Sequence, residues 1–233
     1  MKELFVRWIG QSGYLLFDGE TEICIDPYLS NVVDRLQKRG RMVEAPFPPS
    51  ALKSNLVVCT HNHLDHVDID AIPEMPKDNM MFLAPKAAEE ALRACGVLHY
   101  TPFNEGDSYK VGDFTLIATF AEHSCEAIGL LVRHGDLTLY FSGDTLYNER
   151  LFDLAKEKVD VSFICINGKL GNMSAEQAVR LTRVLSPRLA VPTHYGMFES
   201  NTVAPSVYTD CLPNACALAY NEAYSLKALL DEV

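Results

Sequence analysis

The sequence lacks the paired cysteines and the excess of basic residues that mark several common classes of protein. Its seven cysteines never form a Cys-x-x-Cys pair, so neither a zinc ribbon nor a redox motif is indicated. Lys and Arg number 20 against 31 Asp and Glu, which gives a formal net charge of −11. Nucleic acids and anionic membranes bind clustered cations, so this charge argues against both partners. A small anionic substrate remains compatible with it, because a bound metal ion can reverse the local charge.

Long apolar segments are also missing. No run approaches the ~18 residues that cross a bilayer, and the N-terminal MKELFVRWIGQSG has no apolar region of the kind found in signal peptides. The odd number of cysteines, mostly inside apolar runs, favours buried reduced thiols. We therefore expect a cytoplasmic protein. Its 233 residues, 48% of them hydrophobic, are expected to form one domain (1–233) with a sizeable core.

The apolar pattern predicts a β-rich first part and then strands that alternate with helices. Strands are expected at 4–10, 14–18, 21–26, 55–60, 80–84, 159–166 and 188–194, hairpins at 108–123 and 127–144, and helices at 85–96, 146–158, 174–186 and the C-terminus. Ser174 and Gln177 form a capping-box signature for the helix at 174. Two sheets, each covered by helices, account for this order as a single α/β domain.

Metal-ligand residues are concentrated in residues 57–70, VVCTHNHLDHVDID, which follow directly from an apolar run. The stretch contains His-x-His-x-Asp-His, formed by His61, His63, Asp65 and His66. In an extended segment residues two apart point the same way, so His61 and His63 can face one ion. If the chain then turns into a helix, Asp65 and His66 can face a second ion. Imidazole and carboxylate ligands in this density predict a metal site.

Further ligand types occur at the ends of predicted strands. His123 ends an apolar strand in TFAEHS, Asp144 follows one in LYFSGDT, His194 follows another in LAVPTHYG, and Asp26 follows a fourth in ICIDPYL. Strand ends at one edge of a sheet converge in space, where α/β folds usually place their sites. His99 and His134 lack this setting, and we interpret them as structural or solvent-facing.

These residues, in this order, resemble the metallo-β-lactamase superfamily of hydrolases. Within it, CTHNHLDHVD, INGKLGNMSAEQA and VPTHYGMF are most similar to the L-ascorbate-6-phosphate lactonase-like group, although the segment around Lys169 and Leu170 is shorter here. The resemblance implies an αββα sandwich of two mixed sheets flanked by helices, with the site at the edge of the sheets. It implies two divalent ions, manganese by the subgroup or zinc by the superfamily; the mixed imidazole and carboxylate ligands also suit iron.

The resemblance also implies a role for each matching position. One ion would be held by His61, His63 and His123, and the other by Asp65, His66 and His194. Asp144 would bridge the two ions, and Asp26 would support the histidine loop from behind the ligands. Two close ions can lower the pKa of a shared water and polarise a carbonyl or phosphoryl oxygen. Asp65 and Asp144 are therefore the candidate catalytic residues, with Asp65 as the candidate proton acceptor.

Candidate substrate contacts rest on weaker patterns. Lys169, Asn172 and Ser174 lie at or just before the start of a predicted helix, which suits a phosphate. Tyr195 follows the last ligand, and Asn148 and Arg150 follow GDTLY. We read Cys59 and Cys125, which lie near the motifs, as packing residues.

The residues leave three functions open. The first is a hydrolase that uses a metal-activated hydroxide on a small anionic molecule, such as a phosphorylated sugar lactone. The second is a metal-dependent phosphodiesterase or ribonuclease, which the acidic charge disfavours. The third is a non-catalytic metal-binding protein on the same scaffold. The lactonase-like proteins also suggest a homo-oligomer.

Overall fold

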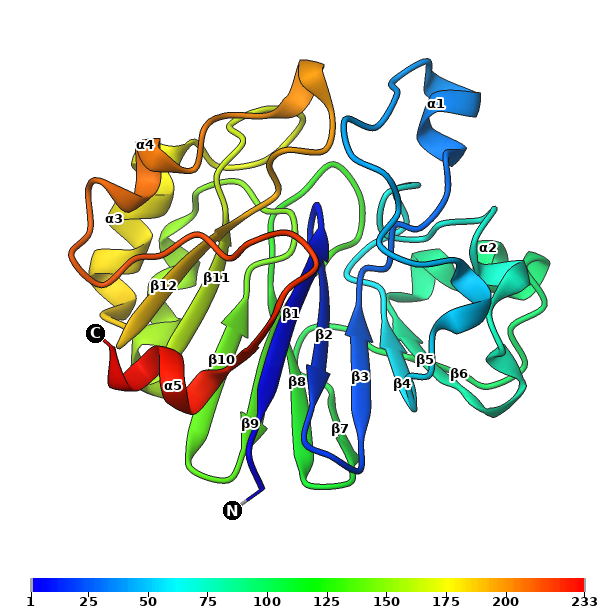
Figure 1. The fold of residues 1–233 in the computed structure, drawn as a ribbon, viewed down its shortest axis with the longest axis horizontal. Coiled ribbons are helices and arrows are strands. Elements are labelled where there is room, and N and C mark those ends of the chain that lie inside the picture. Colours follow the sequence, from blue (N-terminus) through cyan, green and yellow to red (C-terminus); the bar gives the residue numbers. More distant parts are fainter. Residues whose placement is uncertain (1, 233) are drawn as a thin grey trace.

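The computed structural model describes residues 2–232 and shows two β-sheets packed face to face with helices on their outer sides (Figure 1). The strand order is β13-β1-β2-β3-β4-β5-β6 in the first sheet and β12-β11-β10-β9-β8-β7 in the second. The first sheet contains β1 (Phe5–Gly10), β2 (Gly13–Phe17), β3 (Glu22–Ile25), β4 (Leu56–Val58), β5 (Met81–Ala84), β6 (Tyr100–Pro102) and β13 (Ala223–Ser225). The second contains β7 (Ser108–Val111), β8 (Phe114–Phe120), β9 (Ile128–His134), β10 (Leu137–Phe141), β11 (Val161–Cys165) and β12 (Leu189–Thr193). This is the predicted αββα sandwich.

Both sheets are mixed, and their pairing fixes where the strand ends lie. β1, β2 and β3 pair antiparallel, and β3 to β6 pair parallel. In the second sheet β7 to β10 pair antiparallel, and β10 to β12 pair parallel. The carboxyl ends of the parallel strands in both sheets point to the upper edge in Figure 1. Loops from both sheets therefore meet at that edge.

The inner faces of the sheets form the main core. Leu16 and Ile23 of the first sheet and Leu139 and Phe163 of the second are fully buried in it. Aromatic rings fill its centre, with Phe141 and Phe163 stacked at 4.3 Å between ring centroids. Burial of this apolar surface between two sheets is the main force that holds them together.

The helices cover the outer faces. They are α1 (Val32–Gln37), α2 (Glu89–Ala94), α3 (Ala175–Leu185), α4 (Ser206–Thr209) and α5 (Leu226–Asp231), with the longest 3₁₀-helix, η5, at Glu149–Glu157. Leu92 of α2 packs in a second apolar cluster with Val57 and Phe82 of the first sheet. On the other side, Leu181 and Leu185 of α3 pack into the main core.

The predicted helices are present, but their form differs in places. The capping box of α3 is confirmed, since the Gln177 backbone N–H donates to Ser174 Oγ and the Ser174 N–H donates to Gln177 Oε1. The helix expected at 146–158 is a 3₁₀-helix that begins only after the Asn148 cap. The one expected at 85–96 divides into a 3₁₀ turn (Lys86–Ala88) and the short α2. α1 was not expected; it has only six residues and buries only Val32 and Val33.

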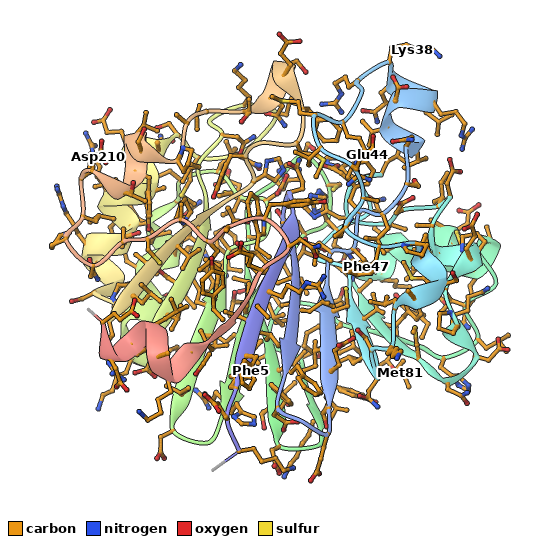
Figure 2. All side chains as sticks on the ribbon, in the orientation of Figure 1. Phe5, Lys38, Glu44, Phe47, Met81 and Asp210 are labelled. Carbon is orange, nitrogen blue, oxygen red and sulfur yellow. The ribbon has the colours of Figure 1, made fainter. Side chains whose placement is uncertain are left out.

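The segment after α1 crosses the upper edge of the first sheet. Figure 2 shows Lys38 at its outer end, and Glu44 and Phe47 where it returns over the sheet. The Tyr220 hydroxyl donates to the Glu44 carbonyl at 2.5 Å, and the Arg7 guanidinium lies 5.6 Å from the centre of the Phe47 ring. These contacts hold the segment at the same edge as the loops that follow the strands. Among the described residues no helix is long and apolar enough to span a membrane.

Candidate metal centre

The predicted ligands meet at the upper edge of the sandwich. Asp26 follows β3, the loop from His61 to His66 follows β4, and His123 follows β8. Asp144 follows β10 and His194 follows β12, so both sheets contribute. The fold thus brings together residues up to 168 positions apart in sequence, as the strand-end argument predicts.

The first group, called the His triad, consists of His61, His63 and His123. His61 Nε2 lies 2.9 Å from His63 Nδ1, and His123 Nε2 lies 3.2 Å from the same atom. The three nitrogens therefore converge on one point. Cys125 is the fourth potential ligand within the same 4.8 Å cluster, and its Sγ lies 3.8 Å from His63 Nε2.

The second group, called the Asp–His triad, consists of Asp65, His66 and His194. Asp65 Oδ2 lies 3.8 Å from His66 Nε2 and 3.9 Å from His194 Nε2. All three ligand atoms fall within 4.8 Å of one another. Separations of this size leave room for an ion between them, since each bond to it would be about 2.0–2.2 Å.

Asp144 lies against both groups. Its Oδ2 is 3.0 Å from His194 Nε2 and its Oδ1 is 3.5 Å from His66 Nε2. It also forms a 4.8 Å cluster with His61 and His66, which links it to the His triad. The carboxylate is therefore placed where it could contact an ion in either group.

In three of the ligand histidines the ring nitrogen that faces away from the cluster has a partner, whereas His194 Nδ1 is buried without one among the described residues. His66 Nδ1–H donates to Asp26 Oδ2 at 2.8 Å, and His123 Nδ1–H donates to the Gly171 carbonyl at 3.0 Å. His61 Nδ1 contacts the Thr60 hydroxyl at 3.2 Å, and that hydroxyl donates to Asp26 at 2.8 Å. Such bonds fix the tautomer, so that Nε2 of each of these three rings carries the lone pair toward the cluster.

Two of the backing residues depend on unusual backbone geometry. Asp26 is fully buried and has a φ of 44°, a left-handed conformation that is costly for a residue with a side chain. Gly171 has a φ of 89°, and a Cβ there would lie 2.8 Å from His123 Nδ1. Glycine is therefore required for the backbone to approach His123 so closely.

The residues fit a divalent cation. His66 Nε2 is buried and has no hydrogen-bond partner, although it faces Asp65 and Asp144. A buried nitrogen lone pair without a donor is costly unless something else binds it. Imidazole and carboxylate donors suit zinc, manganese or iron, so an ion at this point would satisfy the lone pair.

Charges within the centre shift the ionisation of its members. Burial alone would raise the pKa of Asp144, but the imidazoles of His194 and His66 outweigh it and hold that pKa well below its usual value. Burial would lower the pKa of His66, yet the carboxylates of Asp26 and Asp144 raise it well above the ordinary range. By contrast, burial and the neighbouring His66 lower the pKa of His61. The strongly shifted values are typical of a functional site.

A pocket of about 340 Å³ opens onto the centre. It is lined by Gln37, Arg39, His63, Asp65, Ser124, Asp144, Leu170, His194 and Asn201. Among these described lining residues Arg39 alone carries a permanent positive charge. Its guanidinium bonds to the Gln37 side chain and lies 5.5 Å from the centre of the Phe198 ring.

The six predicted substrate residues lie elsewhere; none lines this pocket in the described part of the chain. Lys169 donates to the Ser200 carbonyl at 3.1 Å, and Leu170, the next residue, faces the pocket instead. Ser174 caps α3, and Asn172 is buried and donates to Asn167 at 3.0 Å.

The other three have partners of their own. Tyr195 packs on Trp8 at 4.8 Å between ring centroids. Asn148 donates to Glu122 at 2.6 Å and caps η5, while Arg150 pairs with Glu105 at 2.5 Å in a separate cavity.

Sequence reasoning missed Gln11, Thr60, Gly171 and Arg39. Gln11 and Thr60 lie next to strand ends, but a position at a strand end was used to predict site residues only for His and Asp. Gly171 lies in the INGKLGNMS stretch quoted for the resemblance, and its role depends on a contact 48 residues away along the chain. Arg39 lies in a segment with no motif. Cys125, read as a packing residue, is half-buried beside His63.

Comparison with known proteins assigns the family. The family model described as "Beta-lactamase superfamily domain" matches residues 21–195, which include every predicted ligand. The chain belongs to this superfamily. A UPF0173 metal-dependent hydrolase of Solibacter usitatus is 30% identical over 177 residues, which cover 69% of this chain and 76% of the relative. Another, of Pyrobaculum islandicum, is 27% identical over 202 residues and covers 83% and 84%.

Solved structures share the fold at lower identity. A possible metal-dependent hydrolase of Veillonella parvula has a TM-score of 0.81 at 18% identity, covering 97% of this chain and 100% of that one. An isothiocyanate hydrolase from Delia radicum gut bacteria has a TM-score of 0.79 at 21% identity, covering 95% and 98%. The relatives found do not point to the ascorbate-6-phosphate lactonase group; they point to the UPF0173 metal-dependent hydrolases.

Proposed function

We propose that this protein is a dinuclear metal-dependent hydrolase that acts on a small anionic molecule. The observation that carries the proposal is the pair of triads with Asp144 between them, 3.0 Å from His194 and 3.5 Å from His66. The names of the UPF0173 metal-dependent hydrolase relatives support the same reaction class.

Each acidic residue has a distinct task in this proposal. When bound, the two ions would activate water and polarise the oxygen of the bond under attack. Asp144 would hold the ions at a fixed separation. Asp65 is 14% exposed at its side chain and lines the pocket, so it would take the proton released from the attacking water.

The pocket supports a small substrate with at least one negative charge. A pocket of about 340 Å³ suits a molecule the size of a sugar phosphate rather than a polymer. Arg39 lines the pocket and can bind a phosphate or carboxylate through two parallel N–H groups. A phosphorylated sugar lactone remains our specific proposal. A phosphodiester is the alternative, because the guanidinium would bind it equally well.

The decisive experiment is a substrate panel on chelator-treated protein reloaded with manganese, zinc or iron. We expect one metal to support hydrolysis of L-ascorbate 6-phosphate, with loss of turnover in Asp144→Asn. Cleavage of bis(p-nitrophenyl) phosphate alone would replace the lactone by the phosphodiester. Two bound ions without turnover on any ester, lactone or phosphoester would favour a non-catalytic metal-binding protein.

Arg39→Met tests the anionic part of the proposal. We expect KM to rise about tenfold or more with a smaller change in kcat, since a charge-assisted hydrogen bond contributes about 1.5–3 kcal/mol. Arg150→Met, which removes the same group in a separate cavity, is the matched control for loss of an arginine. An unchanged KM in Arg39→Met would show that this cation does not bind the substrate.

A further inference from the structure

Gln11, in the turn between β1 and β2, is the least expected member of the centre. Its side chain is fully buried, and its Nε2 lies 2.8 Å from Asp65 Oδ2 and 3.1 Å from His194 Nε2. It thus contacts two of the three potential ligand atoms of the Asp–His triad. Neither the family description nor the names of the relatives assign this residue a role.

The backbone of Gln11 is held firmly. Its carbonyl accepts hydrogen bonds from Trp8 Nε1 at 3.0 Å, Thr193 Oγ1 at 2.9 Å and the His194 N–H at 3.1 Å. Its φ is 52°, so the residue is held in a left-handed conformation that only Gly adopts readily. Asp26 and His194 share this rare geometry at the same edge. Strain that the surrounding contacts hold in place in this way is typical of functional sites.

The carboxamide head is only half satisfied. Its nitrogen donates to Asp65, but Oε1 is buried and has no hydrogen-bond partner. A cation held by Asp65 and His194 would face the Gln11 N–H groups, which carry partial positive charge. Rotation about the Cγ–Cδ bond by 180° exchanges oxygen and nitrogen without changing the shape of the side chain. The oxygen would then lie where the nitrogen is now.

We propose that Gln11 Oε1 is a ligand of the second ion, together with Asp65, His66 and His194. Separations of 2.8 and 3.1 Å from the neighbouring ligand atoms are short enough for one ion to contact all three atoms at about 2.0–2.2 Å. Within residues 2–232 no buried amide of this kind contacts the converging nitrogens of the His triad, so the two ions would differ in coordination. The inference rests on the proposed function, because it assumes that the second ion binds.

Two variants with the same backbone strain distinguish a metal ligand at Gln11 from a residue that only donates a hydrogen bond to Asp65. Gln11→Met keeps the length of the side chain but removes both oxygen and N–H. Gln11→Glu keeps an oxygen at the same reach but removes the N–H that donates to Asp65. If Oε1 is a ligand, Glu should substitute for Gln and Met should not. If the N–H to Asp65 is what matters, both variants should fail alike.

The measurement is stepwise binding of Co²⁺ to chelator-treated protein, followed by calorimetry and by the visible absorption of the bound ion. We expect Gln11→Met to weaken one of the two ions about 10–100-fold and leave the other unchanged, with a change in the absorption of that ion alone. Gln11→Glu should bind both ions within about threefold of the wild type. Gln37→Met is the matched control, because its carboxamide bonds to Arg39 and not to a triad.

The outcomes separate the two proposals. Wild type that binds two ions, with Gln11→Glu as weak as Gln11→Met, would overturn the ligand role and leave the proposed function intact. Unchanged binding in Gln11→Met would do the same. Wild type that binds fewer than two ions would overturn both. If Gln11→Met fails to fold, Gln11→Asn withdraws the oxygen by one methylene, and it should weaken the same ion.

Discussion

Two clusters of His and Asp lie at opposite ends of this sandwich. The metal centre occupies the edge where the parallel strands end. At the other end, His134 at the end of β9 contacts Asp18, which follows β2, with His134 Nε2 3.2 Å from Asp18 Oδ2. Asp113 completes a 4.8 Å cluster there, so proximity alone makes it a candidate cation site. Both clusters join the first sheet to the second.

The clusters differ in what their polar atoms already bind. Asp18 Oδ1 accepts the Glu20 and Thr21 N–H groups at 3.0 and 2.8 Å. Asp113 pairs with the Lys2 ammonium at 2.9 Å. At the metal centre, in contrast, His66 Nε2 is buried without a partner and its other nitrogen is held by Asp26. The metal centre therefore differs from an ordinary structural pair in one respect. It contains a buried ring nitrogen that faces other potential ligands and has no partner, on a ring whose opposite nitrogen is held in place.

The largest difference in activity is expected when a carboxylate is changed to an amide at each end of the sandwich in turn. Asp144→Asn removes the charge placed between the triads, and activation by the ions is worth several kcal/mol. We expect kcat/KM to fall by at least about 100-fold, which corresponds to about 2.7 kcal/mol. Asp113→Asn, at the exposed far end, should leave kcat/KM unchanged. Equal activity of the two variants would refute the contrast.

The next contrast concerns the buried carboxylates. Asp26→Asn replaces the carboxylate that accepts from His66 Nδ1–H by a neutral amide, and loss of such a partner typically weakens metal binding about 10–100-fold. Asp18→Asn should lower stability without changing metal affinity. Chelator competition measures the affinity, and urea unfolding of the chelator-treated proteins measures the stability. A similar metal affinity in both variants would mean that Asp26 is merely structural.

Two glycines give a smaller and purely steric contrast. Gly171→Ala would place a Cβ 2.8 Å from His123 Nδ1, whereas Gly112→Ala would place one 2.3 Å from Thr21 Oγ1 at the far end. Both glycines have positive φ, so the backbone penalty of about 1 kcal/mol is shared. We expect only Gly171→Ala to lose metal affinity, by a fewfold. Metal analysis of both purified variants checks this, and equal metal content would show that His123 can move aside.

The smallest expected effect is on acid stability. Burial opposes ionisation of Asp18, but the Thr21 and Glu20 N–H groups and His134 outweigh it and lower the pKa of Asp18. A carboxyl whose pKa is lower in the folded state stabilises the fold above its unfolded pKa, about 3.9. That contribution is lost as the pH falls through the folded pKa. Asp18→Asn should therefore flatten the fall in unfolding free energy below about pH 4, by at most about 1.4 kcal/mol per pH unit. An unchanged slope would contradict it.

The residues proposed as metal ligands were easier to predict from the sequence than the residues that surround them. His61, His63, Asp65 and His66 are recognisable because local spacing and chemistry coincide in one loop. The succession of strands and helices followed from the alternation of apolar runs, and the αββα sandwich followed from the family resemblance. Gln11 and Gly171 were not recognisable, because their roles come from contacts between distant segments. Lys169 shows the limit most clearly, since its neighbour Leu170 faces the pocket instead.

The most direct test of the account is the metal content of chelator-treated protein reloaded with excess zinc or manganese and then desalted, measured together with that of Asp144→Asn and Asp18→Asn. The account predicts about two ions per wild-type chain, fewer in Asp144→Asn, and no loss in Asp18→Asn. One ion or none in the wild type, or a loss of metal caused by Asp18→Asn, would contradict it.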